Sequence, residues 1–179
     1  MAALSSMSLA APPRVVDTMN EDIAQELAGA FTNVTTIAVD TEGVNLSRQG
    51  RISIVQVATS DCCFLVDVLD KSHDDSLVIW LRGLLEDPSI VKIIHDCRMD
   101  SDALFHLLRI NLVNVHDTSC WHAAITHNSD SNLNTMLMHY RLQPNVFRDK
   151  SVYKSNPSFW ALRPLTSQMI QWASGDVSP

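Results

Sequence analysis

Long hydrophobic runs are absent from this chain of 179 residues. No apolar stretch approaches the ~20 residues that a membrane-spanning helix needs, so we expect no membrane association. The first residues also lack the basic start and the apolar centre of a secretory signal. We therefore expect residues 1–14, which are rich in Ala and Ser, to form a disordered tail before one domain, residues 15–179.

Cysteine is scarce, and none of the four cysteines belongs to a CxxC pair. Adjacent Cys62 and Cys63 would point to opposite faces of a strand, so one site cannot easily use both. We expect free thiols in a reducing, intracellular compartment, cytoplasmic or nuclear. Three histidines and one cysteine lie close together in the sequence: His116, Cys120, His122 and His127. Their spacing matches no structural-zinc pattern, and we expect them to have core or surface roles.

Basic residues are outnumbered, with 13 Lys and Arg against 20 Asp and Glu. The net charge of −7 counts against a passive nucleic-acid binder, which attracts phosphates by excess positive charge. A metal-dependent nuclease escapes this objection, because cations cover its carboxylates when it works. Five basic residues share one span with a single acid, Asp149: Arg141, Arg148, Lys150, Lys154 and Arg163. We predict that the last four contact phosphates.

The pattern of apolar residues predicts a single α/β domain. Three β-branched runs joined by short links predict an antiparallel meander: residues 35–42, 51–59 and 64–68. A helical pattern at 77–85 then alternates with short strands at 91–95 and 113–115, and the remainder is mainly helical. Near the start, Asn20 or Thr18 would cap a first helix. We expect a mixed central sheet, with the antiparallel meander plus parallel strands, and helices on both faces.

Two acids stand at the end of the first predicted strand. Asp40 and Glu42 are two residues apart, so their side chains share one face of the strand. Paired carboxylates repel and raise each other's pKa unless a cation joins them. Oxygen-only ligands of this kind suit Mg²⁺ or Mn²⁺.

Two further acids come later in the chain. Asp100 begins a predicted helix, where an acid is ordinarily just a cap. Asp176 follows Trp172 by four residues, which places both on one helix face. Each of these acidic signals is weak alone. Their order along the chain is what distinguishes them from ordinary surface acids and helix caps.

That order resembles the three exonuclease motifs of the DEDD superfamily, in its RNase D-like, DEDDy-type 3′-5′ exonuclease branch. The run IAVDTEG (37–43) is similar to the first motif, and VKIIHDCRMD (91–100) looks like the second. The run WALRPL (160–165) resembles the Trp-x-x-Arg-Pro-Leu sequence before the third motif, and it has no generic secondary-structure reason to exist. The sequence HDCR (95–98) is also similar to that of Egalitarian-related proteins, some of which serve as RNA-binding adaptors.

The resemblance implies a ribonuclease H-like 3′-5′ exonuclease fold with two Mg²⁺ or Mn²⁺ ions. In this family Asp40 would bridge both ions, Glu42 and Asp176 would hold the ion that generates the nucleophile, and Asp100 would hold the second. The implied substrate is single-stranded RNA or DNA. The alternative is a catalytically poor adaptor that binds nucleic acid or a protein partner.

Two positions depart from the family. Trp172 stands where this branch has tyrosine, and an indole N–H only donates. We therefore expect weakened hydrolysis, or else a stacking surface for a base. The family also continues its last helix beyond Asp176, so we expect a truncated C-terminal helix.

Overall fold

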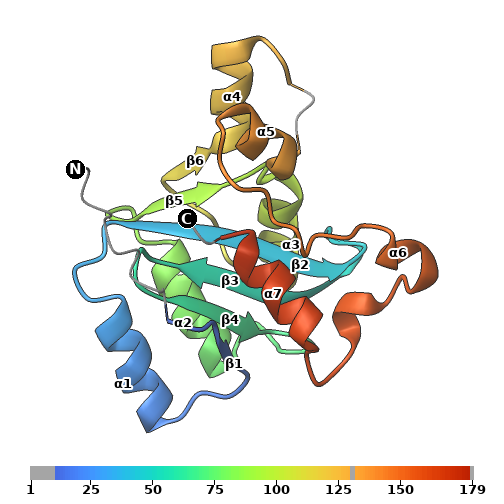
Figure 1. Ribbon diagram of the computed structural model, residues 1–179. Coiled ribbons are helices and arrows are strands. Elements are labelled where there is room, and N and C mark those ends of the chain that lie inside the picture. Colours follow the sequence, from blue (N-terminus) through green and yellow to red (C-terminus); the bar gives the residue numbers. More distant parts are fainter. Residues whose placement is uncertain (1–10, 130–131, 178–179) are drawn as a thin grey trace, which may run out of the picture.

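A six-stranded mixed sheet forms the centre of the computed structural model, which describes residues 11–129 and 132–177, without the side chains of 153 and 154 (Figure 1). Its order is β1-β4-β3-β2-β5-β6. The strands are β1 (Arg14–Val16), β2 (Thr36–Val44), β3 (Arg51–Ala58), β4 (Cys63–Asp67), β5 (Val91–Ile94) and β6 (Val115–Asp117). β2, β3 and β4 pair antiparallel, whereas β1, β5 and β6 pair in parallel with their neighbours. The predicted meander and mixed sheet are confirmed.

The first strand is an element that the apolar pattern does not predict. β1 has three residues, too few to show a two-residue period, and it is placed by parallel pairing with β4. Arg14, the last residue of the predicted tail, begins this strand, and residues 1–10 lie outside the described part of the chain. β6 begins two residues later than the predicted strand at 113–115.

Helices cover both faces of the sheet, as predicted (Figure 1). One face carries α1 (Glu21–Ala30), α2 (Ser76–Leu85) and α3 (Arg98–Leu108) over an aliphatic core. The opposite face carries the 3-10 helix η1 (Phe159–Ala161) and α7 (Ser167–Gly175) over a core rich in aromatic residues. Asn20 caps α1 as predicted, because its side chain accepts a hydrogen bond from Ile23 N at 2.9 Å.

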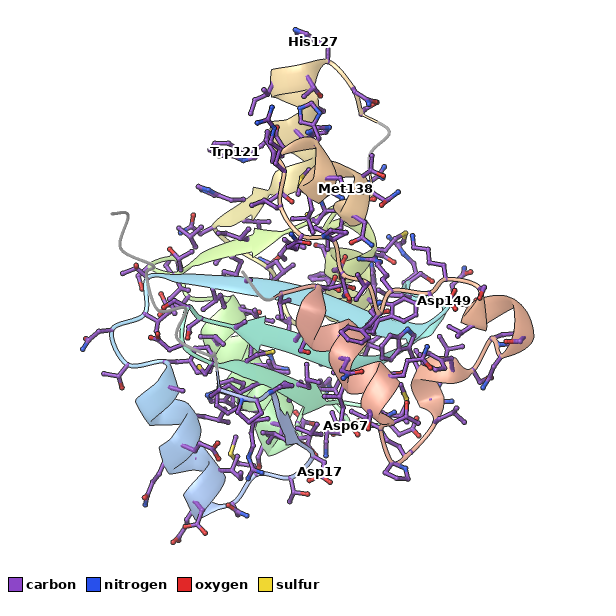
Figure 2. All side chains as sticks on the ribbon, viewed as in Figure 1. Asp17, Asp67, Trp121, His127, Met138 and Asp149 are labelled. Atoms are coloured by element: carbon purple, nitrogen blue, oxygen red, sulfur yellow. The ribbon has the colours of Figure 1, made fainter. Side chains whose placement is uncertain are left out.

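The other helices lie between β6 and η1: α4 (Thr118–Thr126), α5 (Leu133–His139) and α6 (Val152–Ser155). α4 and α5 stand beyond the β6 edge of the sheet, where Trp121 and Met138 are exposed (Figure 2). Within the described residues, none of the helices combines the length and the apolar character needed to cross a bilayer.

A bulge in β3 lies beside the end of β2. Glu42 pairs with Ile54 but Gly43 pairs with Ile52, so Ser53 has no partner in the ladder. As a result Ile52 and Ile54 face opposite cores. Gly43 is needed here, because a Cβ atom would lie 2.1 Å from the backbone oxygen of Arg51.

Arg163 uses this bulge to join the segment before α7 to the sheet. Its Nη2 donates to the Ser53 carbonyl at 3.3 Å and to Asp67 Oδ1 at 2.7 Å, and its Nε donates to the other oxygen of Asp67. Its Nη1 donates to the carbonyls of Trp160 and Leu162 at 2.9 and 2.7 Å. Every N–H group of the guanidinium therefore has an acceptor within the domain.

We predict that Arg163→Met lowers the free energy of unfolding by about 3 kcal/mol, because it leaves the largely buried Asp67 without its cation. Urea denaturation measures the loss. The matched control is Arg51→Met, which breaks the exposed Arg51–Asp70 pair and should cost far less. Equal losses in the two variants would contradict the anchoring role of Arg163.

Candidate metal centre

Three of the predicted acids meet at one place. Asp40 and Glu42 project from β2, and Asp176 follows the last turn of α7. One carboxylate oxygen from each lies within 4.8 Å of the others. In residues 11–129 and 132–177 no other set of three or more His, Cys, Asp or Glu side chains comes together in this way. The histidines and cysteine that match no zinc pattern accordingly form no such group.

Asp100 lies beside these three acids, in the first turn of α3, and is buried. Its Oδ1 accepts hydrogen bonds from Thr41 N at 3.1 Å and from Thr41 Oγ1 at 2.6 Å. Thr41 lies between Asp40 and Glu42 in β2, so one strand both carries two acids and fixes the orientation of a third.

Burial and mutual repulsion make the cluster unfavourable without a cation. The pKa of Asp40 is raised well above its ordinary value, first by burial and then by the charges of Glu42, Asp100 and Asp176, while Arg148 opposes this shift. Burial also raises the pKa of Asp100 and of Asp176. A set of carboxylate oxygens whose charges repel in this way fits a hard divalent cation such as Mg²⁺ or Mn²⁺.

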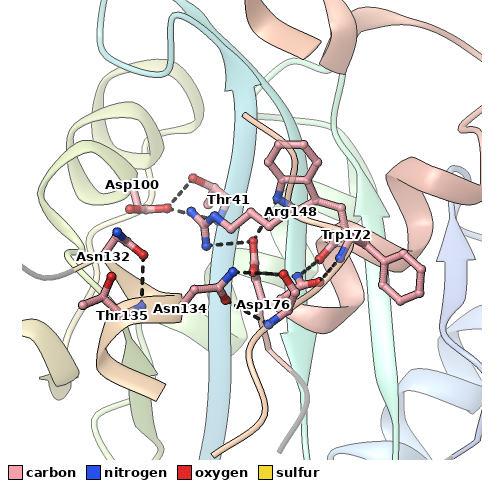
Figure 3. A network of polar contacts seen from close by, with 10 residues as sticks. Thr41, Asp100, Asn132, Asn134, Thr135, Arg148, Trp172 and Asp176 are labelled. Carbon is pink, nitrogen blue, oxygen red and sulfur yellow. Dashed lines mark hydrogen bonds and ion pairs between the residues drawn. The ribbon is translucent and has the colours of Figure 1, made fainter. Parts of the chain in front are cut away.

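Asp176 is held by three donors (Figure 3). Asn145 Nδ2 donates to Oδ1 at 2.8 Å, while Trp172 Nε1 and Arg148 Nη1 lie 3.1 and 3.0 Å from Oδ2. Asn145 lies in the loop between α5 and α6 and belongs to none of the motifs, so no local signal identifies it. Trp172 is 1% exposed and packs edge-on against Trp160, with ring centroids 5.5 Å apart. A ring buried to this degree offers no face on which a base could stack, so the indole orients Asp176 instead.

The four predicted phosphate-binding residues are not all in one place. Arg148 joins the acid cluster, and Lys150 is exposed two residues further along. Lys154 lies in α6, but its side chain is outside the described part of the structure. Arg163 differs from the expectation, because its donors are taken by Asp67 and by backbone carbonyls, with none left for a phosphate.

Asp117, at the end of β6, supports the site from a distance. Its carboxylate accepts hydrogen bonds from the backbone N–H groups of Asp96 and Cys97 at 2.9 and 3.0 Å. These bonds fix the turn between β5 and α3, and α3 carries Asp100. Asp117 therefore helps to position α3 and with it Asp100.

A family model described as 3′-5′ exonuclease matches residues 15–178. The chain belongs to this 3′-5′ exonuclease family. The match covers β2, which carries Asp40 and Glu42, and it also covers α7 and Asp176, which follows that helix.

Relatives and solved structures agree with the family. The piRNA biogenesis protein EXD1 of Mus musculus is 29% identical over 177 residues, which span 88% of this chain and 30% of that protein. The Egalitarian protein homolog of Caenorhabditis elegans is 26% identical over 147 residues, 74% of this chain and 25% of that protein. The chain thus spans less than a third of either protein.

RNase D of Trypanosoma brucei provides the structural comparison. Its GMP complex is 28% identical, with a TM-score of 0.78 over 93% of this chain and 54% of that one. Its complex with RNA U12 is also 28% identical, with a TM-score of 0.74 over 92% and 58% of the two chains. The predicted RNase D-like resemblance and ribonuclease H-like fold are confirmed.

We predict that Asp40→Asn stabilises the metal-free protein at pH 7. The folded-state pKa of Asp40 is raised, so its contribution to stability is complete below the unfolded pKa and is lost as the pH rises through the folded pKa. The advantage of the variant should therefore grow from pH 5 to pH 8. Mn²⁺ should raise the melting temperature of the wild type but not of the variant.

Thermal denaturation in EDTA and in Mn²⁺ measures both effects. Asp70→Asn is the control, since Asp70 is exposed and is not a member of the cluster, and it should keep the wild-type response to Mn²⁺. If Mn²⁺ does not change the melting temperature of the wild type, the assignment of the acid cluster as a metal site is wrong.

Proposed function

We propose that this chain is the catalytic domain of a metal-dependent 3′-5′ exonuclease that hydrolyses phosphodiester bonds of single-stranded RNA or DNA. The observation that carries the proposal is the convergence of Asp40, Glu42 and Asp176, from β2 and α7, within 4.8 Å. Membership of the exonuclease family supports it. The GMP and RNA complexes of the RNase D relative favour RNA as the substrate class.

Each acid would have a separate task in binding two Mg²⁺ or Mn²⁺ ions. Glu42 and Asp176 would hold one ion, Asp100 would contribute to the other, and Asp40 would be shared. When bound, such ions lower the pKa of water and stabilise the leaving oxygen. The chain itself supplies orientation, since Thr41 fixes Asp100 and Trp172 fixes Asp176 before any substrate arrives.

Trp172 also sets the expected rate. Its N–H donates to Asp176 and cannot accept a proton, so it cannot orient an attacking water as the family's tyrosine hydroxyl would. The loss of a positioned acid–base group typically costs ~10²–10⁴-fold in rate. We infer that hydrolysis is slow in the wild type.

Exposed Lys150 would contact phosphates, because it lies in the same loop as Arg148 and points away from the core. Lys154 stays a candidate for the same role. The intracellular location inferred from the cysteines also stays a prediction.

A second function is favoured by the same tryptophan. Without the hydroxyl, the domain would bind nucleic acid, or a protein partner, as an adaptor and hydrolyse nothing. Digestion of 3′-labelled single-stranded RNA and DNA in Mg²⁺, Mn²⁺ or EDTA separates the two functions. The exonuclease releases labelled nucleoside monophosphate with metal and none in EDTA or in Asp176→Asn. Binding without any release of label would establish the adaptor.

We predict that Trp172→Tyr raises the rate in this assay by at least about tenfold, because it restores a hydroxyl beside Asp176. Trp172→Phe is the matched control, since it leaves a similar space but has neither hydroxyl nor N–H, and it should not raise the rate. Circular dichroism verifies that both variants fold. A rate lower than wild type in Trp172→Tyr would show that the indole does not limit hydrolysis.

A further inference from the structure

A cation belonging to the chain already lies among the carboxylates. Arg148 Nη1 is 3.0 Å from Asp176 Oδ2, and the two side chains are 22% and 0% exposed. Burial lowers the pKa of this guanidinium, but the charges of Asp176, Asp40 and Glu42 outweigh burial and raise it above its ordinary value. The guanidinium therefore compensates the charge that a divalent ion would compensate.

The loop that carries Arg148 is held by contacts other than this ion pair. Asn145 fixes the loop through its Nδ2, which donates to the Trp172 carbonyl at 2.8 Å, and through two reciprocal hydrogen bonds with Asn134. The contact with α7 is close, because a Cβ atom on Gly175 would lie 2.7 Å from the Asn145 side chain. Arg148 could leave Asp176 while the loop stays in place.

Arg148 is also less completely bound than a structural arginine in the same domain. Arg163 has an acceptor for every N–H group and binds both oxygens of Asp67. Arg148 meets a single oxygen of Asp176, and its buried Nε has no acceptor among the described residues. A phosphate offers a guanidinium two acceptor oxygens at once, which is the stronger arrangement.

Asp176 cannot serve both cations equally. Its Oδ1 accepts from Asn145, and its Oδ2 accepts from Trp172 and faces Arg148. A divalent ion that shares this carboxylate is repelled by the guanidinium in a buried site where charges are poorly screened.

We propose that Arg148 is a built-in counter-ion that competes with the divalent ion for Asp176, and that a nucleic-acid phosphate relieves the competition by drawing the guanidinium away. The inference rests on the proposed function and adds a regulation of metal binding to it. Metal loading and nucleic-acid binding are then coupled, and each strengthens the other by the same factor. A chain without nucleic acid holds its metal weakly.

Calorimetric titration with Mn²⁺, in the absence of nucleic acid, tests this coupling. Arg148→Met should bind Mn²⁺ about tenfold or more tightly than the wild type, because the competing charge is gone. Arg14→Met is the control, since Arg14 lies on the edge strand β1 and forms an exposed ion pair with Glu26 of α1. This variant removes the same charge and should bind Mn²⁺ as the wild type does. A single-stranded oligonucleotide with a phosphorothioate 3′ linkage should tighten Mn²⁺ binding more in the wild type than in Arg148→Met.

Equal Mn²⁺ affinities of the wild type and Arg148→Met, or no binding by the variant, would overturn the proposal. If the variant does not fold, NMR of the wild type with ¹⁵N-labelled arginine replaces it. Saturation with Mg²⁺ should then shift the Arg148 Nε–H signal, and an unmoved signal refutes the competition. If the wild type hydrolyses the substrate but binds Mn²⁺ no more weakly than Arg148→Met does, the domain is an exonuclease in which Arg148 does not regulate metal binding. Tighter Mn²⁺ binding by Arg148→Met without any hydrolysis rejects the exonuclease alone.

Discussion

Repulsion among buried carboxylates is the constraint on which the functional part of this domain depends. The charges of Glu42, Asp100 and Asp176 all raise the pKa of Asp40 at the centre of the group. Such a cluster persists only if its members are held in place and their charge is compensated. Thr41 and Asn145 supply hydrogen bonds, Trp172 supplies an N–H, and Arg148 supplies a positive charge.

The fold provides the positions at which these groups can meet. β2 pairs with β5 only at residues 36–38, so the two acids that it carries stand just past the end of β5, where β3 is their only partner in the ladder. α3 brings Asp100 to this strand, and α7 brings Asp176 across the opposite face. Arg163 ties the segment before α7 to β3 and β4, at the bulge that lies beside Glu42.

The sequence is informative where the signal is local. A β-branched, apolar run identifies β2, the alternation of side chains along a strand places Asp40 and Glu42 on one face, and the order of the acidic motifs identifies the family. Three residues are too few to reveal β1, which is defined by its pairing with β4. The sequence also shows that Arg148 and Arg163 are positively charged but not what they bind. Asp67 lies 96 residues before Arg163, and the acceptors of Asn145 lie in α7, so both depend on tertiary structure.

We infer that the acid cluster is a divalent-metal site from which Arg148 must withdraw. Anomalous diffraction at the manganese edge, from crystals grown with Mn²⁺ and a non-cleavable oligonucleotide, tests it most directly. We expect a manganese peak bound by Asp40, Glu42 and Asp176, with the guanidinium of Arg148 on a phosphate. A cluster without a manganese peak, with Arg148 still paired to Asp176 beside the bound oligonucleotide, would contradict it.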